Sequence, residues 1–495
     1  MKVLIANRGE IAVRIIRACQ EMDLRSVAVY SEADRGALHT RYAEEALPIG
    51  PTPAGESYLS IPNILEAAEK SGATAVHPGY GFLSENPQFG AAVEEAGLIF
   101  IGPRPETMAV LGDKLSARKA AREAGLPVLP GSDLPLAKDI TLGDIDHDLE
   151  YPLLVKAASG GGGRGIRLAR TDQELVDVVE AARQEAQAAF GDSTIYLEPL
   201  VQKARHIEVQ ILGDGRGTVL TFGERECSIQ RRHQKLIEEA PGPDITPAER
   251  ECLQDSARRL GESLDYRSLG TVEFLRGDDG QFHFIEVNPR IQVEHPVTEM
   301  ITGIDLVRAQ IQLALSGELG IQQDEIRFRG AAIEARLLAE DPGNHFLPTS
   351  GTVSYLKEPG GPGIRVDSAL YQGLKVTTDY DSLLAKVIAW GEDREAAIQR
   401  LGRALREVQI GGIKTDAAFL RQILTSHPYR AAEIDTSFLE GIQLPEGNLK
   451  ESLTRDAALA AALHIHLRRG NGSNQDHKSP SPWRRQAWRE QINGK

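Results

Sequence analysis

Sulfur-containing and aromatic residues are scarce in this chain of 495 residues, which has three cysteines, four methionines and 5% aromatic residues. The cysteines, Cys19, Cys227 and Cys252, are odd in number, lie far apart and form no CxxC pair. Neither a disulfide framework nor a zinc cluster is therefore expected. Because free cysteines are typical of reducing compartments, we expect a cytoplasmic protein.

Long apolar runs and an excess of positive charge are also lacking. No apolar run approaches the ~20 residues that span a bilayer, and Arg8 and Glu10 follow the first residues too closely to leave a signal-peptide core. Lys and Arg number 56 against 71 Asp and Glu, which gives a net charge of −15. We therefore expect neither nucleic acid nor membrane as a partner, and any bound anion must be held by a local cluster of cations.

The first hundred residues alternate strand and helix patterns. Apolar strands are expected at 2–7, 26–30, 73–77 and 98–101, with helices between them. This order predicts a parallel sheet covered by helices, an α/β arrangement. The first turn contains one glycine, Gly9, where a dinucleotide fingerprint needs three, so a NAD enzyme is disfavoured.

Length and pattern together predict several domains. At roughly 150 residues per domain, 495 residues correspond to about three. From about Asp113 the pattern changes to helices followed by long antiparallel strands, and from Gly330 short strands precede amphipathic helices. We predict domains at 1–113, 114–330 and 331–446, followed at 447–495 by a helix and a flexible basic tail.

Lys156 directly precedes a glycine-rich segment, residues 159–165, which lies between apolar runs at 152–155 and 166–169. This arrangement predicts a hairpin, and it lacks the Gly-Lys-Ser/Thr ending of a P-loop. We interpret the segment as a flap whose backbone N–H groups close over phosphates. A surface hairpin without a ligand is the alternative.

Residues 206–212 alternate in polarity, with His206, Glu208 and Gln210 on the polar face. This alternation is typical of the edge of a half-solvated sheet. The next loop, residues 231–235, concentrates positive charge in an otherwise acidic chain. It favours either contact with an anionic substrate or a solvated surface.

The strongest physical signal is a predicted hairpin over residues 270–288. Its turn, residues 277–280, places Glu273 nearly opposite Glu286, and Asn288 falls on the face of Glu286. Two carboxylates crowded at a partly buried spot repel each other, and a hard divalent cation relieves that repulsion. Mg²⁺ keeps few protein ligands, which matches two Glu and one Asn. A salt-bridged hairpin without metal is the alternative.

Arg290 and Glu294 follow this hairpin directly and are four residues apart. Next to a site for Mg²⁺ and ATP, an arginine can clamp an anion and a carboxylate can act as a general base. We therefore expect these two side chains to take part in the chemistry.

Four long strings of residues resemble one known family, the biotin carboxylases, which are the ATP-grasp components of acetyl-CoA carboxylase and related carboxylases. The strings are residues 7–12, 77–86, 224–235 and 288–299, and the resemblance covers about residues 1–444. It implies an N-terminal parallel-sheet domain, an ATP-grasp domain with a glycine-rich lid subdomain at about 130–203, and a C-terminal α+β domain. The one departure is Ser159, which stands where the family commonly has the first of five glycines.

The resemblance implies ATP-dependent carboxylation of biotin N1 by bicarbonate, through carboxyphosphate. By position in the family's motifs, the ATP-binding residues would be Lys114, Lys156, Gly162, Gly163, Glu198, Val201, His206, Gln230, His233, Glu273 and Glu286. The residues for Mg²⁺ or Mn²⁺ would be Glu273, Glu286 and Asn288. Bicarbonate and biotin would be bound by Lys235, Arg290, Gln292, Val293, Arg336 and Tyr80. Glu294 would be the base, with Lys235, Arg290 and Arg336 completing the catalytic set.

The resemblance also implies partners, namely a second copy of the chain in a homodimer, a biotin carboxyl carrier protein or domain, and a carboxyltransferase subunit. The family's carrier domains present biotin on the lysine of an Ala-Met-Lys-Met type hairpin. None of the four methionines, at positions 1, 22, 108 and 300, flanks a lysine in that way, so we expect the carrier in trans. The final acceptor and the role of the tail, with its Trp483 and Trp488, stay open.

Two other functions are compatible with parts of this pattern. Another ATP-grasp ligase, acting through an acyl phosphate, would share the metal hairpin and the lid but does not predict Arg290, Glu294 or Arg336. A non-catalytic nucleotide-binding regulator would be expected to have lost Lys235, Glu294 or a metal carboxylate, and none of them is lost.

Overall fold

The computed structural model describes residues 1–131, 149–158, 166–442 and 460–462. The chain divides into two compact units, Met1–Gln443 and Leu444–Lys495. Nearly all of the second unit, and with it the predicted helix and basic tail, lies outside the described residues, as do Ser159, Gly162 and Gly163.

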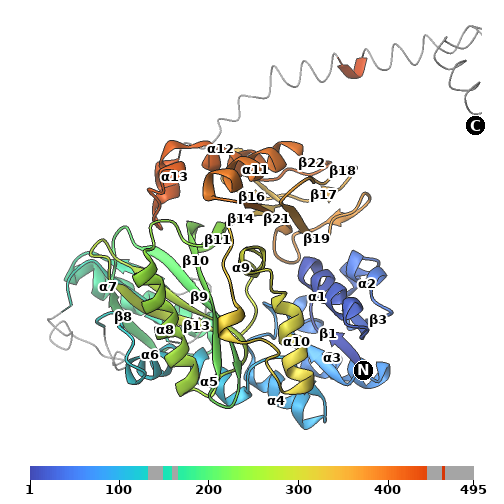
Figure 1. Ribbon diagram of the computed structural model, residues 1–495, viewed down its shortest axis with the longest axis horizontal. Helices are drawn as coiled ribbons and strands as arrows, with labels where there is room; N and C mark the ends of the chain where they lie inside the picture. Colours follow the sequence, from blue (N-terminus) through green and yellow to red (C-terminus); the bar gives the residue numbers. More distant parts are fainter. Residues whose placement is uncertain (132–148, 159–165, 443–459, 463–495) are drawn as a thin grey trace, which may run out of the picture. The chain divides into compact units, whose positions relative to one another are not determined.

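The N-terminal part contains the expected parallel sheet with its covering helices (Figure 1). Five parallel strands lie in the order β3-β2-β1-β4-β5. The strands are β1 Lys2–Ile5, β2 Arg25–Tyr30, β3 Glu45–Pro48, β4 Ala75–His77 and β5 Ile99–Phe100. The helices are α1 Gly9–Glu21, α2 Leu38–Tyr42, α3 Ile61–Ser71, α4 Pro87–Glu95 and α5 Pro105–Gly112. The sequence did not indicate β3, a short edge strand without a fully buried residue.

A three-stranded antiparallel sheet follows, in the order β7-β6-β8. Its elements, with the neighbouring helices, are α6 Lys114–Glu123, β6 Leu153–Ala157, β7 Ile166–Ala169, α7 Asp172–Phe190 and β8 Ile195–Pro199. Strands β6 and β7 pair antiparallel, with Lys156 opposite Ile166. The hairpin predicted on either side of the glycine segment is therefore confirmed, although its tip lies outside the described residues.

An eight-stranded sheet forms the centre of the first unit, in the order β13-β12-β9-β10-β11-β14-β21-β19. Its strands are β9 Arg205–Asp214, β10 Val219–Arg231, β11 Gln234–Ala240, β12 Arg267–Arg276, β13 Phe282–Asn288, β14 Ala331–Leu338, β19 Ile364–Ser368 and β21 Leu383–Gly391. Antiparallel pairing of β11 with β14 carries the sheet across position 330. The domain boundary expected there is thus not a break in the sheet, and the domain limits stay predictions.

The prediction that residues 206–212 form a half-solvated sheet edge is wrong. Strand β9 lies in the interior of the sheet, between β12 and β10, and both Glu208 and Gln210 are fully buried. The apolar face packs under α6 and α8, Pro247–Ser263. The polar face is buried as well because charged side chains from neighbouring strands cover it and pair with it.

The C-terminal part adds short strands and helices around the far end of the same sheet. The helices from residue 295 onward are α9 His295–Thr302, α10 Leu306–Ser316, α11 Arg394–Glu407, α12 Ala417–Thr425 and α13 His427–Arg430. The short strands are β15 Glu340–Asp341, β16 Leu347–Pro348, β17 Gly351–Thr352, β18 Tyr355–Lys357, β20 Lys375–Val376 and β22 Gln409–Gly411. The apolar faces of α11 and α12 pack on β14 and β21 in one core. The two amphipathic helices expected here are confirmed.

Two expectations from composition can be compared with the described residues. Cys19, Cys227 and Cys252 are all free thiols, as their spacing predicts. Among the described helices, none combines the length and apolarity needed to cross a bilayer.

Candidate active site

The carboxylate pair predicted from the sequence forms in the β12–β13 hairpin. Glu273 stands directly opposite Glu286, and the hairpin closes through the hydrogen bond from Gly280 N to Gly277 O at 3.0 Å. Asn288 donates its amide to Glu273 Oε1 at 2.8 Å. Burial, together with the charge of Glu273, raises the pKa of Glu286. The carboxylate of Glu286 makes no hydrogen bond or ion pair with any residue the structure describes, so it is available to a cation.

Lys235 is the cation around which the buried carboxylates gather. Its Nζ lies 2.5 Å from Glu208 Oε2, 3.1 Å from Glu273 Oε1 and 2.6 Å from Glu294 Oε1. Burial alone would lower the pKa of this ammonium group, but the three carboxylates outweigh burial and hold the pKa well above its usual value. Lys235 therefore stays charged and ties the β12–β13 hairpin to the segment of Glu294.

Glu294 is fully buried between two cations. Lys235 contacts one carboxylate oxygen, and Arg336 Nη2 donates to the other at 2.9 Å. Burial would raise the pKa of Glu294, but Lys235, Arg336 and Arg225 outweigh it and hold the pKa well below the usual value. The carboxylate is thus ionised and oriented, which a proton acceptor requires.

A second layer of residues, missed in the sequence, holds this cluster in place. Arg225 is fully buried and donates to Glu208 Oε1 at 2.6 Å, to Gln210 Oε1 at 2.8 Å and to Thr271 Oγ1 at 3.1 Å. Glu238 accepts a hydrogen bond from Arg336 Nε at 2.6 Å. The polar face of residues 206–210 was the signal that could have identified Glu208. Arg225 and Glu238 offered no such signal, because their partners lie on other strands.

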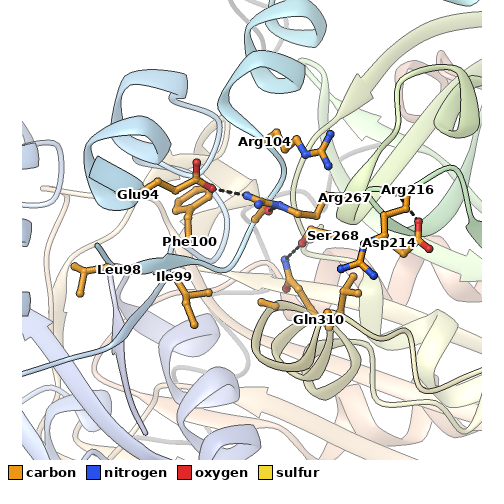
Figure 2. A pocket seen from close by; sticks show the side chains of 14 residues that line it. Glu94, Leu98, Ile99, Phe100, Arg104, Asp214, Arg216, Arg267, Ser268 and Gln310 are labelled. Atoms are coloured by element: carbon orange, nitrogen blue, oxygen red, sulfur yellow. Dashed lines mark hydrogen bonds and ion pairs between the residues drawn. The ribbon is translucent and has the colours of Figure 1, made fainter. Parts of the chain in front are cut away.

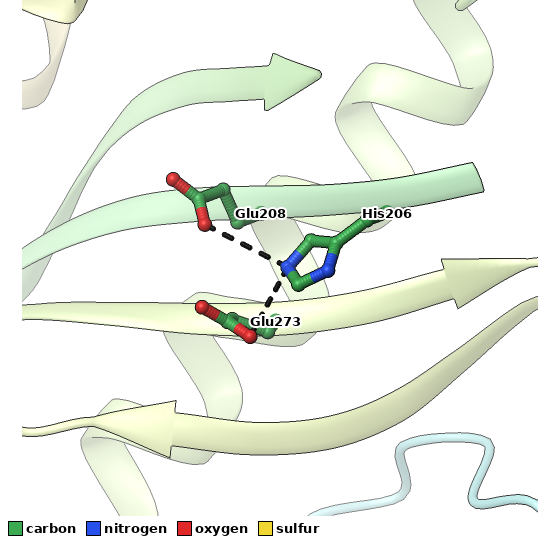
Figure 3. Close-up of side chains that lie close together, drawn as sticks. All are labelled: His206, Glu208 and Glu273. Atoms are coloured by element: carbon green, nitrogen blue, oxygen red, sulfur yellow. Dashed lines mark ion pairs between the residues drawn. The ribbon is translucent and has the colours of Figure 1, made fainter. Parts of the chain in front are cut away.

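His206, on the same strand as Glu208, points toward Glu273 on the neighbouring strand and so joins the cluster (Figure 3). Its Nε2 lies 3.1 Å from Glu273 Oε2, and its Nδ1 lies 2.9 Å from the side-chain amide of Gln230. Burial would lower the pKa of the imidazole, yet the carboxylates of Glu273 and Glu208 outweigh burial and raise it. One ligand atom each from His206, Glu208 and Glu273 lie within 4.8 Å of one another, which is close enough for a shared cation.

The other residues expected to bind ATP approach from the three-stranded sheet and from α6. Lys156 and Arg118 both form ion pairs with the carboxylate of Glu198, and all three are buried. The charges of Lys156 and Lys114 add to burial in lowering the pKa of His233. Both lysines therefore contribute positive potential at His233, which suits a polyphosphate. Val201 follows the last strand of the same small sheet, β8.

His233 is placed by a two-residue turn between β10 and β11. Arg231 pairs with Gln234 across the turn, and Arg232 and His233 both have positive φ, at 50° and 63°. Turns of this kind match the twist of a hairpin. Arg231 of the basic run turns away to Glu340, at 2.7 Å. Contact of the rest of the run with an anionic substrate stays a prediction.

Arg290 and Gln292 line the cluster on the side of the β12–β13 hairpin. Arg290 Nε donates to Glu85 Oε1 at 2.7 Å, and its Nη1 donates to Gln292 Oε1 at 3.1 Å. Gln292 in turn donates to Glu273 Oε1 at 3.2 Å. Since Glu85 belongs to the N-terminal sheet domain, this ion pair joins that domain to the site.

Val293 and Tyr80 are connected through a buried ion pair. The ammonium of Lys386 is fully buried, donates to Val293 O at 3.0 Å and lies 3.2 Å from Glu10 Oε2. Tyr80 donates its hydroxyl to the other oxygen of Glu10. No pattern in the sequence points to Lys386, whose partners come from segments about 90 and 370 residues away.

The fold and the site together define an ATP-dependent ligase of the ATP-grasp class. Models of known families match three consecutive segments. They are the biotin carboxylase N-terminal domain at residues 1–108, the ATP-binding domain of the carbamoyl-phosphate synthase L chain at 113–322 and the biotin carboxylase C-terminal domain at 334–441.

Curated relatives agree with these domain matches. The chain is 47% identical to the biotin carboxylase of Nostoc sp. over 89% of this chain and 98% of that one. It is also 47% identical to one of the subunits of pyruvate carboxylase from Methanothermobacter thermautotrophicus, over 89% of each chain. The chain therefore belongs to the biotin carboxylase family.

Solved structures show the same likeness. The biotin carboxylase of Campylobacter jejuni, solved as a β-γ-ATP complex, superposes with a TM-score of 0.87 at 42% identity, over 89% of this chain and 98% of that one. The biotin carboxylase domain of the Hydrogenobacter thermophilus 2-oxoglutarate carboxylase, a dimer solved with MgADP, ADP and bicarbonate, gives 0.86 at 45% identity over 89% and 97%. The expected α/β architecture with an ATP-grasp domain is confirmed.

Proposed function

We propose that this chain carboxylates biotin N1 at the expense of ATP and bicarbonate, as the first half-reaction of a biotin-dependent carboxylase. One observation carries the proposal: Lys235 bonds to Glu294 on one side and to the metal hairpin on the other. That contact supports a role for Glu294 as a proton acceptor close to where the terminal phosphate of ATP would be held.

Glu273, Glu286 and Asn288 would hold Mg²⁺ or Mn²⁺, and the free carboxylate of Glu286 fits a hard divalent cation. The cation would supply charge neutralisation for the terminal phosphates of ATP. Lys114, Lys156, Glu198, Val201, His206, Gln230 and His233 are the residues we assign to the nucleotide, together with Gly162 and Gly163 in the predicted lid.

Bicarbonate would bind to Lys235, Arg290, Gln292 and the backbone of Val293. Cations favour the deprotonated form of a nearby acid, so Lys235 and Arg290 would lower the proton affinity of the bound bicarbonate as Lys235 lowers that of Glu294. Glu294 would take the proton while the bicarbonate oxygen attacks the γ-phosphate, which gives carboxyphosphate and ADP.

Carboxyphosphate would break down to carbon dioxide and phosphate beside the biotin ring. The phosphate would take the proton of biotin N1, and Arg336 and Tyr80 would stabilise the negative charge that develops on the ureido oxygen. Because carboxyphosphate hydrolyses, the proposed lid must exclude water during this step.

The partners of the chain belong to the same proposal. We propose that the chain acts as a homodimer in the cytoplasm on a biotin carrier supplied by another chain, and that a carboxyltransferase subunit takes over the product. The related chains belong both to a pyruvate carboxylase and to a 2-oxoglutarate carboxylase, so likeness alone leaves the final acceptor open. Intact-mass analysis that finds covalent biotin on this chain would contradict the role in trans.

The experiment is to follow ADP release with bicarbonate and free biotin varied independently. We expect release to require bicarbonate and to rise with biotin. An ATP-grasp ligase of another specificity would show neither dependence, and a nucleotide-binding regulator would release no ADP under any combination.

A further inference from the structure

A cavity of about 400 Å³ lies outside the proposed active site, and no residue of the site lines it. Its walls come from three places: residues 94–104 of the N-terminal domain, the ends of strands β9 and β12, and the last turn of α10 (Figure 2). The site residues Glu208 and Glu273 stand six positions away on the same two strands, which is about 20 Å at the rise of a strand. Both places can therefore be occupied at once.

Three arginines face this cavity, namely Arg104, Arg216 and Arg267 (Figure 2). Arg267 forms an ion pair with Glu94 at 2.7 Å, and its Nε donates to Gly102 O at 3.1 Å. Arg104 donates to Gly215 O at 2.7 Å, which satisfies one of its N–H groups, and it forms no ion pair with any residue that the structure describes.

Arg216 is exposed and has no side-chain partner among the described residues, although Asp214 lies two positions away. One oxygen of Asp214 instead accepts the backbone N–H groups of Arg216 and Thr218, at 2.7 and 3.0 Å. The two acidic residues that line the cavity therefore already have partners. Glu94 pairs with Arg267, and Asp214 accepts the two backbone N–H groups. Positive charge therefore remains in the cavity although the net charge of the chain is −15, and a guanidinium fork matches phosphate geometry.

A buried acceptor faces the same space. Gln310 is 2% exposed, donates to Ser268 Oγ at 3.0 Å and hydrogen-bonds the buried ring of His77. A carbonyl oxygen has two lone pairs, so Gln310 Oε1 can accept a further hydrogen bond from a hydroxyl or amino group of a ligand. The rest of the wall is apolar and includes Phe100 and Leu313.

We propose that this cavity binds a phosphate monoester of a small hydroxylated metabolite. The phosphate group lies between Arg216 and Arg104, and a ligand hydroxyl donates to Gln310 Oε1. The cavity volume suits a molecule the size of a pentose phosphate or a nucleoside monophosphate. This inference does not depend on the proposed function, because binding is measured directly and not through turnover.

The test is calorimetric titration of the full chain with ribose 5-phosphate, the active site being saturated with MgADP. We expect one site per chain, no heat from ribose, and at least tenfold weaker binding in Arg216→Ala. Arg406→Ala, which removes an exposed arginine of α11, is the matched control and should bind as the parent does. Ala314→Phe, which fills the cavity from α10, should abolish binding while bicarbonate-dependent ADP release is kept.

Three outcomes would overturn the proposal. They are the absence of a binding heat with ribose 5-phosphate, an unchanged affinity in Arg216→Ala, and equal affinity for inorganic phosphate. The last would mean that the cavity does not recognise the organic part of the ligand, against the role given to Gln310.

Discussion

Glu286 lies directly across the β12–β13 hairpin from Glu273, but only Glu273 is neutralised by protein groups that the structure describes. Glu273 contacts Lys235 and His206, and these cations outweigh burial and lower its pKa, whereas the pKa of Glu286 is raised. The two paired carboxylates therefore differ in how readily they ionise. A divalent cation would stabilise the ionised form of Glu286, whose pKa is raised, more than that of Glu273.

The first prediction concerns that carboxylate. Glu286→Ala should lose Mg²⁺-dependent ADP release by about 10²-fold or more, with at best partial rescue by excess metal, because a main protein ligand is gone. Asp278→Ala removes an exposed acid from the tip of the same hairpin and should leave the Mg²⁺ titration unchanged. A titration of Glu286→Ala that overlays the parent's would show that the hairpin binds no metal.

The second prediction concerns Glu294. Glu294→Gln keeps the shape of the side chain but removes its charge, so bicarbonate-dependent ADP release should fall by about 10²- to 10⁴-fold while MgADP binding persists. Steady-state turnover and nucleotide titration together measure this split. Near-normal turnover would exclude Glu294 as the base, and a parallel loss of nucleotide affinity would indicate a structural role instead.

The register of the β12–β13 hairpin could be predicted because the turn and both strands are contiguous in sequence, which leaves one antiparallel alignment. The β-α-β order of the first hundred residues could be predicted for the same reason, since neighbouring elements follow one another in the sequence. Arg225 and Glu238 could not be predicted, since each acts through a strand whose neighbour is set by the whole sheet. The same limit made an interior strand, β9, look like an edge: its polar face is buried by arginine and lysine from β10 and β11.

The third prediction concerns the dependence of stability on pH. His39 is fully buried, and burial lowers its pKa from 6.5 to about 4. The unfolded chain therefore binds a proton that the folded chain does not as pH falls below 6.5, and stability is lost down to about pH 4. At pH 5 the loss attributable to His39 should be about 2 kcal/mol in the free energy of unfolding.

The measurement is urea unfolding at pH 7 and pH 5 for the parent and for His39→Gln. The variant should show a smaller decrease between the two pH values, whatever its stability at pH 7. His427→Gln, which replaces an exposed histidine of α13, should match the parent at both. An equal decrease in His39→Gln and the parent would mean that His39 is protonated in the folded state.

The last prediction concerns Lys386, the fully buried lysine that donates to Val293 O and pairs with Glu10. Lys386→Met should raise the KM for bicarbonate several-fold more than the KM for ATP, because it frees the backbone that we assign to bicarbonate. It should also destabilise the fold by leaving Glu10 buried without its cation. Burial already raises the pKa of Glu10 to about 7, so the unpaired carboxyl would be held neutral at neutral pH.

The double variant Glu10→Gln with Lys386→Met separates these two effects. Since it removes both charges, it should recover much of the stability lost in Lys386→Met, because no buried group is left without its counterion. It should not recover the KM for bicarbonate, because Val293 O still lacks its donor. If stability and KM recover together, Lys386 supports the fold alone. If the double variant keeps the raised KM with restored stability, Lys386 positions the bicarbonate loop.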